Sequence, residues 1–98
     1  MSTSGPPRFD VRLRSRRVQR ELDALQGSDY RRVLGALQAL AQDPRPPGCE
    51  KLYDDVYRVR VGVWRIIYLV DQAHRRVEVG GVRRRSERTY RGIEELFT

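Results

Sequence analysis

The stretch from Tyr57 to Tyr68, YRVRVGVWRIIY, limits the possible folds more than any other part of this chain. Before Gly62, aromatic or apolar residues alternate with arginines, which is the period of a β-strand with one buried and one exposed face. After Gly62, residues 63–70 are nearly all apolar, as is typical of a central strand covered on both sides. The sequence therefore predicts two strands that meet at Gly62. Arg65 interrupts the second strand, and because guanidinium groups are seldom buried unpaired we expect it to reach a cleft or a carboxylate.

The remaining segments predict an α+β domain. Alternating apolar residues indicate a first strand over residues 9–13, and 3.6-residue periodicity indicates two helices between Ser15 and Pro44, separated at Gly27. A last strand is expected over residues 76–82, with Gly80 and Gly81 allowing a bulge, and a short helix follows from Ser86. The order is β-α-α-β-β-β with a short C-terminal helix. We expect the helical hairpin to pack on one face of an antiparallel sheet.

The chain is 98 residues long, which suits one small domain. We expect residues 1–7 to form a disordered tail and residues 8–98 to form the domain. A single cysteine excludes an internal disulfide, and the spacing of Cys and His fits no metal site, so no metal or cofactor is expected. Without an apolar run of transmembrane length or a signal-peptide core, we expect a cytoplasmic protein that has no contact with membranes.

The charge is unevenly distributed along the chain. The formal net charge is +7, and residues 56–91 contain ten arginines and three acidic residues. The rest of the chain is therefore neutral overall, and the whole excess belongs to the second half. Such a patch is expected where a protein meets phosphates or an acidic partner.

The order of elements, the pair Lys51-Leu52 before the central stretch, and the Arg-rich exit VRRRSERTYR resemble the RelE/ParE toxin superfamily. This resemblance covers about residues 8–91 and implies the toxin of a bacterial toxin–antitoxin pair. RelE-like members are metal-independent endoribonucleases that cut mRNA in the ribosomal A site by driving a ribose 2′-OH onto the adjacent phosphate. ParE-like members share the fold but inhibit DNA gyrase. Both kinds are neutralised by a cognate antitoxin.

The resemblance also implies the functional residues. The implied catalytic set is Arg58, Arg60, Arg65, Arg84 and Tyr90, and the implied RNA contacts are Lys51, Tyr53, Arg83 and Arg85. Arg83 or Arg85 remains an alternative to Arg84, because spacing alone does not fix the register. Tyr53 stands where the RelE-like pattern favours a basic residue, and Tyr53 and Tyr57 are the candidates for stacking on bases.

The expected chemistry needs positive charge on the phosphate, a proton acceptor for the 2′-OH and a donor to the leaving 5′-oxygen. Alternation places Arg58 and Arg60 on the same face of the sheet, where cations stabilise developing charge. Arginine is a poor general base, whereas nearby guanidinium groups lower the pKa of a phenol. Tyr90 is therefore the candidate base or orienter of the 2′-OH.

Structural roles are the alternative for each residue. Tyr90 would dock the last helix, Arg58 and Arg60 would be solvated or contact the antitoxin, and Arg65 would pair with Asp71 or an N-terminal acid. Trp64 and Tyr68 are expected in the core, on the face opposite Arg65.

Three functions remain open at this point: an mRNA endonuclease toxin, a gyrase inhibitor, and an inactive homologue retained for its antitoxin complex. We expect the antitoxin to cover Arg58, Arg60 and Arg84 with acidic residues.

Overall fold

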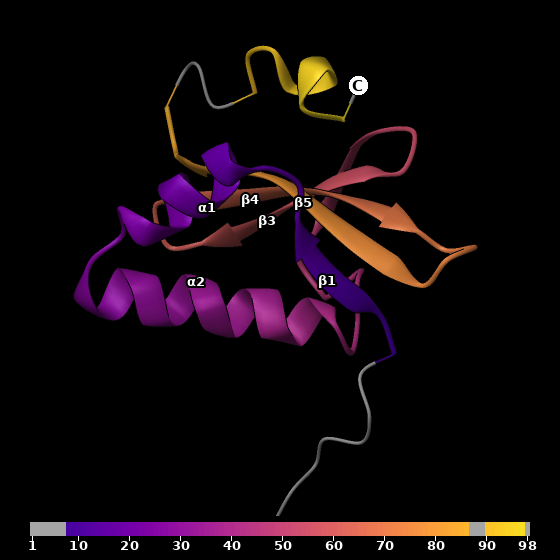
Figure 1. The fold of residues 1–98 in the computed structure, drawn as a ribbon, viewed down its shortest axis with the longest axis horizontal. Helices are drawn as coiled ribbons and strands as arrows, with labels where there is room; N and C mark the ends of the chain where they lie inside the picture. The colour runs from indigo at the N-terminus through magenta and orange to yellow at the C-terminus, as the bar shows by residue number, and fades with distance from the viewer. Residues whose placement is uncertain (1–7, 87–89, 98) are drawn as a thin grey trace, which may run out of the picture.

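A computed structural model describes residues 8–86 and 90–97 of the chain (Figure 1). The predicted tail, residues 1–7, lies outside this part. The elements in chain order are β1 (Asp10–Leu13), α1 (Arg16–Asp23), α2 (Gly27–Leu40), β2 (Glu50–Tyr53), β3 (Val56–Val61), β4 (Trp64–Asp71), β5 (Arg76–Arg84) and the 3-10 helix η1 (Ile93–Phe97). The predicted α+β class, with two helices ahead of the main sheet strands, is confirmed.

The five strands form one sheet in the order β1-β5-β4-β3-β2. Neighbouring strands from β2 to β5 are antiparallel, whereas β1 pairs parallel with β5. The sheet is therefore mixed, because the edge strand β1 runs parallel to its neighbour β5. Strand β2 was expected only as a lead into the central hairpin. It has four residues and a register shift between Lys51 and Tyr53, so it is too short and irregular to show a period of two.

The predicted meeting point of β3 and β4 is confirmed. Val61 pairs with Trp64, which leaves Gly62 and Val63 as a two-residue loop. Gly62 has a φ of +60°, and glycine at the first position of a two-residue hairpin loop adopts this value without steric cost.

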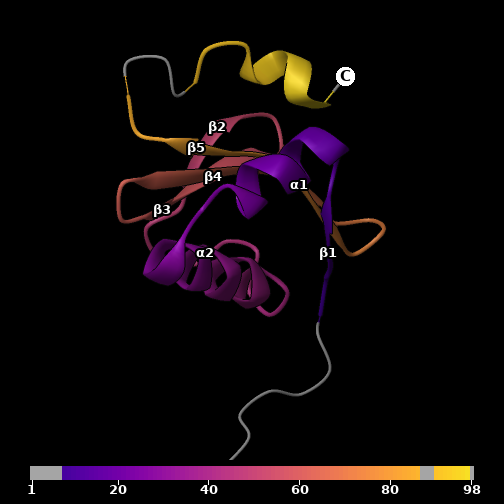
Figure 2. The same cartoon turned by 60° about the vertical axis from the view of Figure 1, so that its left-hand side comes forward.

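The helices cover one face of the sheet and η1 covers the other (Figure 2). On the helix-covered face, side chains of α1 and α2 pack against apolar residues of β3, β4 and β5. Tyr68 is fully buried there, and its hydroxyl donates to the Pro44 carbonyl oxygen at 2.7 Å. Trp64 is half-buried against the same core, so the predicted core positions of both aromatic residues are confirmed.

The opposite face carries a smaller apolar cluster centred on Val56, Ile67 and Leu96. The predicted C-terminal helix is a 3-10 helix that begins at Ile93, and residues 87–89 of the predicted span lie outside the described residues. Ile93 and Leu96 dock on the sheet, whereas Tyr90 remains 39% exposed. Within residues 8–86 and 90–97, no helix is long and apolar enough to cross a membrane.

A bulge at Gly80 changes the facing of the end of β5. Ile67 pairs with Gly81 and Tyr68 pairs with Val79, so Gly80 has no partner on β4. Two side chains of α1 bond the backbone of β5 beside the bulge: Arg17 donates to the Gly80 carbonyl at 3.2 Å, and Glu21 accepts from the Val82 N–H at 2.9 Å. The ring of Phe97 packs directly on Gly80, where an added Cβ would lie 2.5 Å from it.

We predict that Gly80→Ala destabilises the protein by about 1–3 kcal/mol, because the new methyl group overpacks the site of Phe97. The matched control is Gly35→Ala, where an added Cβ meets nothing within 4 Å. This change in α2 should stabilise by about 0.5–1 kcal/mol. Urea unfolding measures both values. Equal effects of the two substitutions would contradict the packing seen at Gly80.

Candidate functional site

Three arginines stand in one row across the sheet. Arg60 of β3 is directly opposite Arg65 of β4, which is directly opposite Arg83 of β5. Directly paired residues project from the same face, and this is the face away from α1 and α2. Like charges directly opposite each other destabilise a sheet. The row therefore needs compensation from elsewhere in the structure.

Arg65 is compensated by the backbone of its own hairpin. Its side chain is buried, and Nη1 donates to the carbonyl oxygens of Gly62 and Trp64, each at 2.9 Å. The alternative ion pair with Asp71 is not formed. Asp71 instead accepts hydrogen bonds from the backbone N–H of His74 and contacts its ring, and these contacts hold the pKa of Asp71 below its ordinary value. Arg65 is thus fixed in position by main-chain oxygens, which carry no formal charge.

Arg83 ties the row to the C-terminal segment. Its Nη1 donates to the carbonyl oxygen of Arg91 at 2.8 Å, which brings the neighbouring Tyr90 to the same end of the sheet. Arg60 is exposed to solvent at the other end of the row. The side chains of the three cations therefore differ in solvent exposure, from exposed Arg60 to buried Arg65.

Arg58 lies one step along β3 on the same face as Arg60, as predicted. Only 7% of its side chain is exposed, and Nη2 lies 3.0 Å from the carboxylate of Glu50, whose side chain is 61% exposed. The Nε and Nη1 atoms of Arg58 are buried and have no hydrogen-bond partner among the described residues. Glu50 was missed by the sequence analysis, since it comes from β2. The pairing of β2 with β3, which places Glu50 opposite Arg58, is the signal that would have found it.

Arg84, the arginine named in the predicted set, lies on the opposite face from the row. It pairs with Trp64 and so projects from the helix-covered face, with its guanidinium 6.0 Å from the centre of the indole ring. Arg83, the stated alternative, completes the row instead. Lys51 pairs with Tyr57 and thus faces the helix side, away from the row.

Tyr53 and Arg85 are the remaining predicted RNA contacts. The hydroxyl of Tyr53 donates to the Ile93 carbonyl at 3.4 Å, and its ring packs in the smaller apolar cluster. Burial, helped by the nearby carboxylates of Glu94 and Asp54, raises the pKa of Tyr53. Tyr53 therefore supports the C-terminal segment and does not offer a free stacking surface. Arg85 is exposed and extends the β4–β5 pairing, since its backbone N–H donates to the Val63 carbonyl at 2.6 Å.

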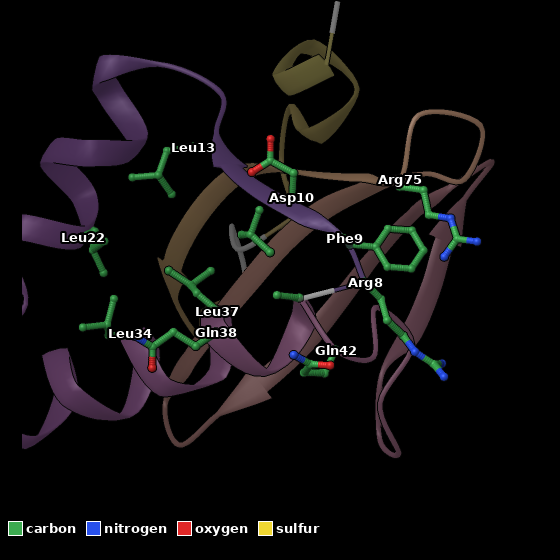
Figure 3. Close-up of a pocket in the computed structure, with 12 residues that line it drawn as sticks. Arg8, Phe9, Asp10, Leu13, Leu22, Leu34, Leu37, Gln38, Gln42 and Arg75 are labelled. Carbon is green, nitrogen blue, oxygen red and sulfur yellow. The ribbon is translucent and has the colours of Figure 1, made fainter. Parts of the chain in front are cut away.

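A separate apolar groove of about 890 Å³ lies between β1 and the helices (Figure 3). In Figure 3, Leu22 and Leu34 line one end of it, and Arg8 and Arg75 stand at the other. β1 is an edge strand, paired only with β5 among the described strands. The groove is on the helix side, so it is distinct from the arginine row.

Comparison with known proteins shows the family of this chain. The sequence model described as "ParE toxin of type II toxin-antitoxin system, parDE" matches residues 12–89. The chain belongs to the RelE/ParE family of toxins. No curated protein sequence matches this toxin.

Solved structures share its fold. The archaeal RelE–RelB complex from Pyrococcus horikoshii OT3 is similar with a TM-score of 0.71 and 24% identity, over 82% of this chain and 98% of that chain. The RelBE2 toxin–antitoxin complex from Mycobacterium tuberculosis has a TM-score of 0.68 and 22% identity, over 85% and 98% of the two chains. The isolated E. coli RelE toxin has a TM-score of 0.68 and 18% identity, over 90% and 98%. At these identities the likeness concerns the fold.

We predict that Arg65→Gln destabilises the toxin by about 1–3 kcal/mol, because it removes the donor that satisfies two main-chain carbonyl groups of the hairpin. Arg60→Gln removes the same charge from an exposed position and should change the stability by no more than about 0.5 kcal/mol. Chemical denaturation of the two variants separates these outcomes. A loss at Arg60 as large as that at Arg65 would mean that the hairpin carbonyls do not hold Arg65.

Proposed function

We propose that this toxin is a metal-independent endoribonuclease that cleaves mRNA on the ribosome. The observation that carries the proposal is the row Arg60–Arg65–Arg83, joined by Arg58 on the same face. A row of like charges across adjacent strands costs folding free energy, and a chain gains nothing from it unless an anion binds there. A phosphate of RNA is an anion that suits several guanidinium groups.

The proposed step is an in-line attack of O2′ on the adjacent phosphorus. The O2′–P bond forms as the P–O5′ bond breaks, which leaves a 2′,3′-cyclic phosphate and a free 5′-hydroxyl. The proton of the 2′-OH goes to an acceptor, and the leaving O5′ receives one from a donor. No redox change or co-reactant is required.

The proposed role of each residue follows from how firmly the structure fixes its side chain. Arg65 and Arg83 would hold the phosphate and stabilise the charge that develops on it, because they are positioned before the substrate arrives. Arg58 and Arg60 would bind the phosphate or donate to the leaving oxygen. Tyr90, exposed beside the end of the row, would orient the 2′-OH or accept its proton. The substrates are translated mRNAs, so we place the activity in the cytoplasm.

A non-enzymatic gyrase inhibitor is the second candidate. It is favoured by the family model that matches, which is that of ParE, and by the burial of Arg58 and Arg65, which are each less than 10% exposed. DNA gyrase would then be the partner, and the arginines would provide contacts only. A homologue without activity, retained for its complex with an antitoxin, is the third candidate.

A cognate antitoxin is the expected partner in all three cases, since the similar structures from Pyrococcus horikoshii and Mycobacterium tuberculosis are toxin–antitoxin complexes. We propose that its apolar side chains occupy the groove between β1 and the helices, where β1 also offers an unpaired edge. Acidic residues of the same antitoxin would cover Arg58, Arg60 and Arg83. The earlier expectation for Arg84 moves to Arg83 because of the facing of β5.

We predict that Arg83→Ala and Tyr90→Phe each lower the rate of mRNA cleavage, by roughly 100-fold for Arg83→Ala because it removes a preorganised cation. Arg84→Ala is the matched control, since it removes the same charge from the neighbouring position on the other face, and its rate should stay within about threefold. Primer extension on translating ribosomes with purified toxin measures the new 5′ ends.

Two results would contradict the nuclease proposal. The first is equal loss of cleavage with Arg83→Ala and Arg84→Ala, which would assign the effect to net charge. The second is intact mRNA together with inhibited supercoiling by gyrase, which would establish the ParE-like function.

We predict that Leu34→Glu weakens binding of the antitoxin encoded beside this toxin by at least about tenfold, because it places a charge in the apolar groove. Ala39→Glu makes the same charge change at an exposed position of α2 that does not line the groove. It should alter the affinity by less than about twofold. Calorimetric titration of both variants tests this, and equal affinities would remove the groove from the antitoxin interface.

A further inference from the structure

The pair formed by Arg58 and Glu50 is asymmetric. The guanidinium is buried, with 7% of its side chain exposed, whereas the carboxylate partner is 61% exposed. Burial of a guanidinium is costly unless hydrogen-bond acceptors or an anion compensate it. Glu50 provides that anion, and its exposed carboxylate stays largely hydrated. Moving the Glu50 carboxylate away from Arg58 would therefore cost this carboxylate little free energy of solvation.

The hydrogen bonds of Arg58 are also incompletely used. A guanidinium offers two parallel donors, Nε and Nη2, to an acceptor that approaches from the side. Glu50 accepts only from Nη2, at 3.0 Å. Nε and Nη1 remain without partners in a site shielded from water. Unsatisfied buried donors are rare in folded proteins and need an explanation.

The surroundings of the pair favour an anion other than Glu50. Arg60 lies two residues from Arg58 on the same face, and Arg65 and Arg83 continue the row across the sheet. Glu50 enters from β2, at the edge of the sheet, and is directly opposite Arg58. The exposed carboxylate of Glu50 therefore stands at the border of the arginine row.

We propose that Glu50 is a displaceable internal anion, which occupies Arg58 in the free toxin and is replaced by a phosphate group of the bound ligand. This inference rests on the proposed function for the identity of the ligand as RNA. A tetrahedral phosphate has oxygens for both Nε and Nη2, so the exchange replaces a single hydrogen bond by a bidentate contact. Arg58 is never left unpaired during the exchange. Glu50 thus lowers the affinity of the free toxin for polyanions and keeps a buried cation compensated until a phosphate arrives.

The test is the affinity of Glu50→Gln for a 2′-O-methyl RNA dodecamer, which cannot undergo attack by a 2′-OH. Glutamine keeps an oxygen that accepts from Nη2 but removes the charge. We expect binding to be at least about fivefold tighter, because the phosphate no longer competes with a like charge.

Two variants control this result. Asp54→Asn makes the same change of net charge in the turn that follows β2, where the φ of +43° is one that asparagine tolerates, and it should change the affinity by less than about twofold. In the double variant Glu50→Gln, Arg58→Gln the gain should disappear. A gain of the same size with Asp54→Asn, or one that survives removal of Arg58, would overturn the inference.

A measurement on the unaltered toxin covers the case in which a variant does not fold. Titration with inorganic phosphate should shift the Nε–H resonance of Arg58 in the NMR spectrum, and an unmoved resonance at saturation would overturn the inference. Cleavage is not needed for either experiment. Tighter binding without any cleavage of mRNA would refute the nuclease proposal alone, and cleavage with unchanged affinity of Glu50→Gln would refute this inference alone.

Discussion

The pairing of β4 with β3 on one side and β5 on the other is the constraint on which the rest of the structure depends. Because successive residues of a strand project to opposite faces, this pairing assigns Trp64, Ile66 and Tyr68 to the helix-covered core and Arg65 and Ile67 to the other face. Burial of the first set against α1 and α2 is the dominant favourable term. The arginines are therefore held in a row by the packing of the opposite face. A one-residue shift of strand register would turn the apolar core residues toward solvent.

The face with the arginines is stabilised mainly by main-chain oxygens. Arg65 uses the carbonyl groups of Gly62 and Trp64, and Arg83 uses that of Arg91. A carbonyl oxygen satisfies a guanidinium without cancelling its charge, whereas a carboxylate would neutralise the site. Arg58 instead pairs with a carboxylate, that of Glu50 at the sheet edge. The positive potential of the face is thus preserved while its donors are held in place, which is the preorganisation that anion binding requires.

Much of the fold could be predicted from the sequence, because its signals are local. The alternation before Gly62, the apolar run after it and the cap at Ser15, whose Oγ accepts from the Val18 N–H, are readable within a few residues. The parallel pairing of β1 with β5 and the contribution of Glu50 depend on partners distant in the chain, and no local pattern reports them. The same limit applies to the candidate site, because Glu50 and Arg83 join it through pairing between strands.

The choice of Arg84 over Arg83 shows how one residue of register decides a functional assignment. Val77 and Val79 project into the helix-covered core, so strict alternation of side chains along β5 would place Arg84 on the face of the row. The bulge at Gly80 shifts the alternation by one, so Val82 returns to the core and Arg83 takes the place beside Arg65. A bulge was expected near Gly80, but its exact effect on the pairing is decided by contacts with β4 and α1.

The same bulge bears on how this family can diversify. Loss or gain of a single residue near Gly80 would reverse the side of every residue that follows in β5, with no substitution at any arginine. Chain length in this one strand would then decide whether a homologue presents a cation beside Arg65. Here three consecutive arginines, 83–85, follow the bulge. Loss of one residue beside the bulge, with the bulge kept, would place Arg84 opposite Arg65, so the run keeps an arginine in the row after that shift of register.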